Sequence, residues 1–178
     1  MTKNDLAKEI YNTAHITGEF LLRSGKISNE YFDKYKFESD PVLLDAIASY
    51  LVNLIPNETE ILAGLEMGGI PLASAISLKN QIPTVFVRKK AKEYGTRKLA
   101  EGPDFAGKKV CIVEDVVTTG GQIIESANEL RKLGAEIDSV ICVIVREEKA
   151  FENLGSANLN LIPLFSMKEI KEIVGVSE

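Results

Sequence analysis

The sequence contains no tryptophan, one histidine and two cysteines. A single histidine, His15, and two cysteines within the apolar runs VCIV and ICVIV cannot form a zinc site of the usual nitrogen and sulfur ligands. No Ser-His-Asp or Cys-His arrangement is evident either. We expect His15 to be structural or exposed, and Cys111 and Cys142 to be free core thiols rather than a disulfide.

Long apolar runs are also missing. None approaches the length of a membrane span, and residues 1–16 have acids and amides where a secretory signal has an apolar block. These features predict a cytoplasmic protein that does not act at a membrane.

Positive charge is scarce overall, because 21 Lys and Arg oppose 26 Asp and Glu, for a net charge of −5. A nucleic-acid-binding protein normally has a basic surface, so a nucleic-acid partner is not expected. The length of 178 residues and the 45% hydrophobic content are typical of one globular domain. We expect an N-terminal hood at about residues 1–38 and an α/β core at 39–178.

Apolar patterning predicts the elements of this core. Residues 4–14 have helical spacing, and Asp40 and Pro41 are a typical helix start for a segment that ends before Pro56. Apolar strands then alternate with helices, which predicts a mainly parallel sheet with helices on both faces and a ligand site at the carboxyl ends of the strands. The expected strands are 60–64, 84–89, 108–115, 137–146 and 158–164, and the expected helices are 68–80, 122–134, 147–154 and one opened by a Ser166–Glu169 capping box.

The segment 20–37 contains five of the twelve aromatic residues, with near alternation at Tyr31, Asp33 and Tyr35. It predicts a small hairpin or cap packed on the core, in preference to a wall for a flat ligand.

The strongest chemical signal is the sequence EDVVTTGG. The acids Glu114 and Asp115 end a buried strand, and the loop Thr118–Gly121 leads directly into a helix. A helix N-terminus with glycines and threonine hydroxyls suits a phosphate, and two carboxylates suit vicinal sugar hydroxyls. Neighbouring strand residues point to opposite faces, so both acids can reach one sugar only if the strand is turning there. An ordinary strand–turn–helix is the alternative.

A second signal is basic. Residues 88–98 contain six Lys or Arg and one acid, within an acidic chain. The polar stretch from about Lys90 to Pro103 is long for a connection between strands, which favours a basic lid that excludes water over a leaving anion. A solvated basic loop is the alternative.

These motifs resemble a known family. EDVVTTGG after VCIV is similar to the phosphate-binding motif of type I phosphoribosyltransferases. The segments FLLRSGKISNEYFD, GLEMGGIPLASA, VRKKAKEYGTRKLAEG and IVREE narrow the resemblance to orotate phosphoribosyltransferases, from about Phe20 to Glu148.

The resemblance implies the type I phosphoribosyltransferase fold and transfer of ribose 5-phosphate from phosphoribosyl pyrophosphate (PRPP) to orotate. The products would be orotidine 5′-monophosphate and pyrophosphate, in pyrimidine biosynthesis. It also implies a homodimer and Mg²⁺, bound mainly through the pyrophosphate with no dedicated protein ligand.

The resemblance further implies residue roles. Lys92, Arg88 and Asp115 would be catalytic. PRPP would be bound by Arg88, Lys89, Lys92, Tyr94, Glu114, Asp115, Val116, Val117, Thr118, Thr119, Gly120, Gly121 and Gln122. Orotate would be bound by Arg23, Tyr31, Phe32, Thr118 and Arg146.

Three positions depart from the family pattern. Tyr94 stands where histidine is common, Met67 where a lysine sometimes occurs, and Arg23 where lysine is frequent. Two alternatives remain: a phosphoribosyltransferase for another base, and a non-catalytic relative that binds the same ligand as a regulator.

Overall fold

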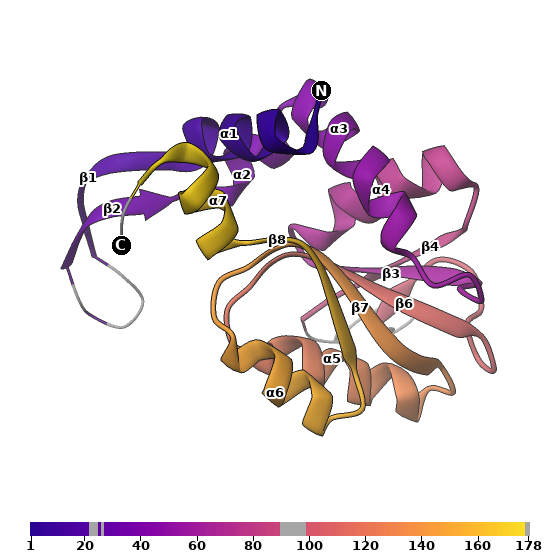
Figure 1. The fold of residues 1–178 in the computed structure, drawn as a ribbon. Coiled ribbons are helices and arrows are strands. Elements are labelled where there is room, and N and C mark those ends of the chain that lie inside the picture. The colour runs from indigo at the N-terminus through magenta and orange to yellow at the C-terminus, as the bar shows by residue number, and fades with distance from the viewer. Residues whose placement is uncertain (22–24, 26, 90–98, 177–178) are drawn as a thin grey trace.

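The computed structural model describes residues 1–21, 25, 27–89 and 99–176 (Figure 1). Three residues predicted for the site, Arg23, Lys92 and Tyr94, lie outside this set.

A six-stranded sheet forms the centre of the molecule, in the order β5-β4-β3-β6-β7-β8. Five strands are parallel: β3 (Ile61–Leu65), β4 (Thr84–Val87), β6 (Lys109–Val117), β7 (Glu136–Val145) and β8 (Asn160–Ser166). The edge strand β5 (Ala100–Glu101) runs antiparallel to β4. The prediction of a mainly parallel α/β sheet is therefore confirmed, whereas the two-residue β5 was not predicted.

Helices cover both faces of the sheet (Figure 1). On one face lie α1 (Lys3–Ala14), α3 (Pro41–Leu51) with the short 3-10 helix η1 (Val52–Leu54), and α4 (Gly69–Asn80). On the other lie α5 (Gly121–Lys132) and α6 (Lys149–Ser156). Cys111 belongs to the first apolar cluster and Cys142 to the second, and both are buried and free, as predicted.

The hood, residues 1–38, contains α1, an antiparallel hairpin of β1 (His15–Leu21) and β2 (Ile27–Phe32), and α2 (Lys34–Glu38). A small hairpin or cap was predicted for this segment, and the structure has a hairpin; the residues Asp33 and Tyr35 lie beyond its second strand. The strand ends at Phe32, because the carboxylate of Asp33 accepts a hydrogen bond from the Tyr35 amide and caps α2.

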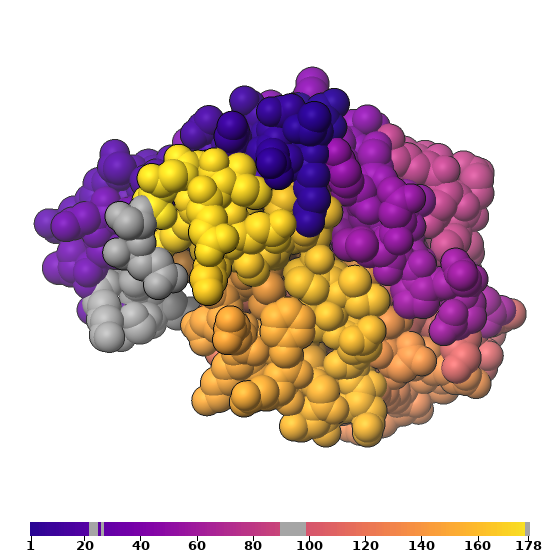
Figure 2. Space-filling model, viewed as in Figure 1, coloured from indigo at the N-terminus to yellow at the C-terminus, as the bar shows by residue number. Residues whose placement is uncertain are grey.

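The C-terminal helix α7 (Met167–Val174) packs beside α1, as the space-filling view shows (Figure 2). Lys3 joins the two, with its Nζ 3.3 Å from the Glu169 carboxylate and 4.9 Å from the centre of the Phe165 ring.

Local capping signals explain several boundaries. Asp40 accepts hydrogen bonds from the amides of Val42 and Leu43, and Pro41 is the first residue of α3. Ser166 and Glu169 form the predicted capping box of α7. Each cap contributes about 1 kcal/mol to helix stability.

The strand order reverses between β3 and β6, since the chain runs from β3 outward to β4 and later returns to the other side of β3. Crevices outside the carboxyl ends of strands form at such a reversal and are common ligand sites. Among the described residues, no helix has both the length and the apolarity needed to cross a lipid bilayer.

Candidate functional site

A cavity of about 500 Å³ lies at this reversal. Its walls come from the turn after β3, the end of β4, the end of β6 and the start of α5, with α2 of the hood on one side. They include Lys34, Tyr35, Glu66, Met67, Lys89, Glu114, Val116, Val117, Thr118, Thr119, Gly120, Gly121 and Gln122. The cavity therefore brings together most of the residues predicted for PRPP.

The loop Thr118–Gly121, hereafter the phosphate loop, ends at the N-terminus of α5. Gly120 is the N-cap and has a φ of 80°. Because glycine has no side chain, no side chain caps the first turn of the helix. A Cβ at Gly120 would lie 2.9 Å from Leu154 Cγ, and Asn153 donates a hydrogen bond to the Thr119 carbonyl at 2.9 Å. Helix α6 thus supports the loop from behind, which leaves the first-turn amides of α5 suited to an anion.

The two acids at the end of β6 differ in their surroundings. Glu114 lines the cavity, whereas the side chain of Asp115 is fully buried beneath it. The regular alternation of faces changes near these acids, because Val113 packs in the first apolar cluster and Val117 in the second, although they are four residues apart. Of the two acids, only Glu114 is among the residues that line the cavity.

Asp115 is held by α2. Its Oδ2 lies 2.5 Å from Lys34 Nζ, and Glu38 is 6% exposed beside it. Burial alone would raise the pKa of Asp115, but the neighbouring carboxyl groups of Glu114 and Glu38, which can donate to it when protonated, and the charge of Lys34 outweigh it, so the pKa lies below its ordinary value. Burial would likewise lower the pKa of Lys34, yet its interactions with Asp115 raise it.

The pKa of Glu38 is raised to about 9, first by burial and then by the adjacent carboxylate of Asp115. Burial and the neighbouring Asp115 charge also raise the pKa of Glu114. The cluster therefore favours fewer negative charges than its three carboxyl groups carry when fully ionised.

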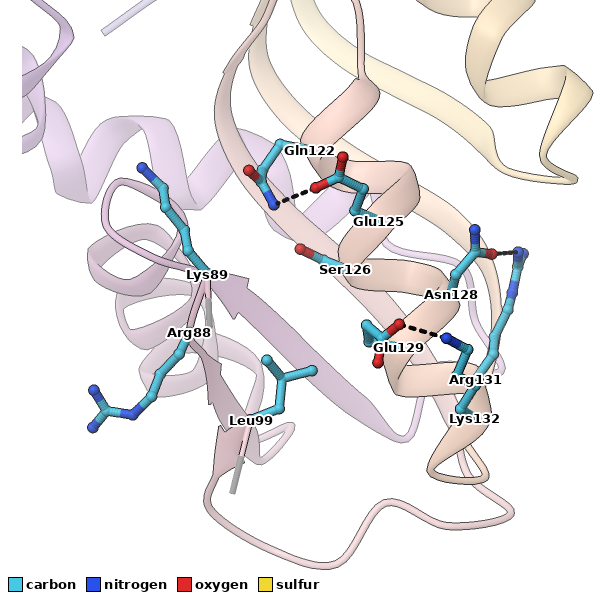
Figure 3. Close-up of a pocket in the computed structure, with 10 residues that line it drawn as sticks. All are labelled: Arg88, Lys89, Leu99, Gln122, Glu125, Ser126, Asn128, Glu129, Arg131 and Lys132. Carbon is cyan, nitrogen blue, oxygen red and sulfur yellow. Dashed lines mark hydrogen bonds and ion pairs between the residues drawn. The ribbon is translucent and has the colours of Figure 1, made fainter. Parts of the chain in front are cut away.

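A second cavity, of about 790 Å³, runs along α5 and shares Lys89, Gln122 and Glu125 with the first (Figure 3). Arg88 also lines it, but in Figure 3 the Arg88 and Lys89 side chains leave the chain in different directions. The buried Arg88 Nε has no hydrogen-bond acceptor among the described residues, so it has a donor to offer a ligand.

The turn after β3 carries Glu66 and Met67. Glu66 Oε1 accepts a hydrogen bond from the Lys89 amide at 2.8 Å, which ties this turn to the end of β4. Gly68 follows Met67, and its lack of a side chain leaves room for Asp115, because a Cβ at Gly68 would overlap Asp115 Oδ2.

Of the described residues predicted for orotate, Thr118 lines the first cavity, and Tyr31, Phe32 and Arg146 line neither cavity. Tyr31 is exposed beside Phe20, with ring centres 5.4 Å apart. Phe32 points the other way, toward Tyr11 and Phe37. Arg146 follows β7 at the carboxyl edge of the sheet, and no ion pair joins it to any acid in the described part of the chain.

Three residues of the site region were not found from the sequence: Lys34, Tyr35 and Glu38. Lys34 and Glu38 are one turn apart on α2, so they share a face of that helix. The only signal for them in the sequence was Asp115, an acid at the end of an apolar strand, because a buried carboxylate needs a cation or a hydrogen-bond donor beside it.

Comparison with known proteins identifies the family of the chain. The family "Phosphoribosyl transferase domain" matches residues 36–157. The orotate phosphoribosyltransferase of a Nocardioides species is 47% identical over 165 residues, covering 93% of this chain and 92% of that protein. The crystal structure of orotate phosphoribosyltransferase from Aeropyrum pernix has a TM-score of 0.80 at 27% identity, covering 96% of this chain and 98% of that one.

A third relative was crystallised with PRPP. This orotate phosphoribosyltransferase from Mycobacterium tuberculosis has a TM-score of 0.81 at 23% identity, and the match covers 94% of this chain and 98% of that one. At that identity the likeness supports the fold. Because the family match spans more than half of the chain and the first relative is similar over nearly all of it, the chain belongs to the phosphoribosyltransferase family, and within it to the orotate phosphoribosyltransferases.

Proposed function

We propose that the protein transfers ribose 5-phosphate from PRPP to a ring nitrogen of orotate. The bond from the anomeric carbon to the pyrophosphate oxygen breaks, and its electron pair leaves with the pyrophosphate. The ring nitrogen supplies the electron pair for the new bond to that carbon. The products are orotidine 5′-monophosphate and pyrophosphate, as in the pyrimidine pathway. Orotate can react as an anion, so no strong general base is needed.

One observation carries the proposal. The phosphate loop and the first turn of α5 stand beside Glu114 in one cavity at the strand reversal. Amides of the first turn would bind the 5′-phosphate, with each charged hydrogen bond worth about 1.5–3 kcal/mol. Glu114 would accept from a ribose hydroxyl. We place PRPP in this cavity rather than in the larger cavity along α5, because of the two only the first is lined by the phosphate loop.

Departure of pyrophosphate builds negative charge on the leaving group, which nearby cations stabilise. Lys89 lines the cavity, and the unpaired Arg88 Nε supports a role for Arg88. Lys92 and Tyr94, implied by the family resemblance, complete this set of donors. We assign Lys92 as the main catalytic cation of residues 88–98.

Mg²⁺ would neutralise part of the pyrophosphate charge when bound. In the described part of the chain, no group of three or more His, Cys, Asp or Glu side chains is placed to hold a metal ion. The proposal that pyrophosphate oxygens hold it is compatible with the preference of Mg²⁺ for substrate phosphates and water.

Orotate would lie at the carboxyl edge of the sheet, under the hood. Arg146 is exposed at that edge and free to pair with the orotate carboxylate through its planar fork. Tyr31, Phe32, Arg23 and Thr118 are further candidates from the resemblance.

We propose a homodimer in the cytoplasm. The free, buried cysteines are compatible with a reducing compartment. Sedimentation analysis at several concentrations tests the dimer.

The direct test is a base panel. Purified protein with PRPP and Mg²⁺ is given orotate, uracil, adenine or hypoxanthine, and base consumption is followed by ultraviolet absorbance. We expect turnover with orotate and release of one pyrophosphate per nucleotide. Turnover only with another base, or PRPP binding without any turnover, would instead support one of the two alternatives.

A further inference from the structure

Helix α2 places two side chains against the buried carboxylate of Asp115. Lys34 and Glu38 are four residues apart and lie on the same face of the helix. Lys34 Nζ is 2.5 Å from Asp115 Oδ2. A Cβ at Gly68 would overlap that same oxygen and lie 2.9 Å from Glu38 Oε1, so the two carboxyl groups meet at this point.

The hydrogen bonding of these oxygens is incomplete if both acids are ionised. Glu38 Oε1 and Asp115 Oδ2 are both buried, and neither has a hydrogen-bond donor of acceptable geometry among the described residues. Two facing carboxylate oxygens repel each other, and an unsatisfied buried oxygen is costly. A proton on Glu38 removes both problems, because the neutral acid then donates to Asp115.

We propose that Lys34 and Glu38 are positioning residues for the PRPP site: Lys34 neutralises Asp115, and a protonated Glu38 donates a hydrogen bond to it. The three groups then carry no net charge. The inference rests on the proposed function, in which the end of β6 binds the ribose.

The arrangement matters for the cavity because Asp115 is adjacent to Glu114. Asp115 held on the hood side of β6 fixes the backbone that directs Glu114 into the cavity. Lys34 itself also lines the cavity. Helix α2 of the hood thus orders the proposed PRPP site, although it lies outside the EDVVTTGG motif.

Glu38 faces Lys34 and Asp33 from α2 and its cap, and Asp115 from β6, which also brings the Glu114 charge near. Gly68, in the turn after β3, contributes no charge. Since the pKa of Glu38 is about 9, its proton should be present at neutral pH and lost in mildly alkaline solution.

The test compares Glu38→Gln, Glu38→Ala and Lys34→Met with the matched control Lys36→Met, an exposed lysine of the same helix. KM and kcat for PRPP and orotate are measured from pH 6.5 to about 9.5. PRPP binding by calorimetry and thermal unfolding are measured alongside, so that loss of folding is detected.

Glutamine keeps a neutral donor, so Glu38→Gln should retain its PRPP KM and lack the rise in KM that the wild type shows near pH 9. Glu38→Ala and Lys34→Met should raise the PRPP KM about 10- to 100-fold, the equivalent of one charged hydrogen bond, with a smaller effect on orotate. Lys36→Met should match the wild type. A Glu38→Gln variant as impaired as Glu38→Ala, or one with an unchanged alkaline rise, would overturn the proposal.

Infrared spectroscopy separates this inference from the proposed function. At pH 7.5 the protein should show a carbonyl band of a protonated carboxyl group that is reduced in Glu38→Gln. Absence of orotate turnover in the wild type would defeat the proposed function, whereas absence of this band difference would defeat the protonated Glu38.

Discussion

Substitution of Gly68 by alanine tests the packing beneath the site. The added Cβ would overlap Asp115 Oδ2 and lie 2.9 Å from Glu38 Oε1. Gly68 has a φ of −69°, so the backbone accepts alanine and the expected cost is purely steric. Overpacking of this kind destabilises by about 1–3 kcal/mol.

For a chain of this size, each kcal/mol corresponds to about 2–4 °C in Tm, so Gly68→Ala should melt about 2–12 °C below the wild type. The displaced Asp115 should also raise the KM for PRPP. Differential scanning calorimetry and steady-state kinetics measure the two effects.

Gly155→Ala is the matched control. No atom lies within 4 Å of a Cβ at Gly155, which is in α6, so alanine should stabilise by about 0.5–1 kcal/mol through helix propensity. If Gly68→Ala showed the Tm and KM of the wild type, the close contact of the turn with Asp115 would be refuted.

Four further predictions follow from single side chains. Lys92→Ala should lower kcat about 10²- to 10³-fold at unchanged Tm, and an unaltered kcat would remove it from catalysis. Arg146→Ala should raise KM about 10- to 100-fold for orotate and little for PRPP; equal changes would exclude it from the base site. The guanidinium of Arg131 donates to three backbone carbonyls of β7 and the segment after α6. Arg131→Met should therefore lower Tm by about 4–12 °C, unlike Lys132→Met, and similar Tm values for the two would contradict this. The free energy of unfolding in urea should fall by up to about 1.4 kcal/mol per pH unit as the pH rises from about 5 to 9, because folded Glu38 keeps its proton to about pH 9 while unfolded Glu38 has lost it. Glu38→Gln should flatten this slope. A slope identical to that of the wild type would contradict the protonation of Glu38.

Most of the core was predictable because its signals are local. Asp40 with Pro41 and Ser166 with Glu169 mark helix starts by direct side-chain capping, which neighbouring residues alone determine. The path of the chain around Thr118–Gly121 was likewise predictable, because a strand, a glycine turn and a helix follow one another within a few residues. The binding of a phosphate there stays a prediction.

The remaining features depend on contacts between distant segments. Helix α2 forms where the sequence itself shows near alternation, and its Lys34 contacts Asp115, a residue that is distant in the sequence. The edge strand β5 has two residues and exists through its pairing with β4. The placement of both acids at one sugar stays a prediction: Glu114 lines the cavity, and Asp115 is buried against Lys34.

Crystals of the protein grown with PRPP and Mg²⁺ would show whether the cavity between the phosphate loop and Glu114 binds PRPP. We expect the 5′-phosphate at the amides of Thr118–Gly121 and a ribose hydroxyl on Glu114. PRPP bound elsewhere, for example only in the larger cavity along α5, would contradict this expectation.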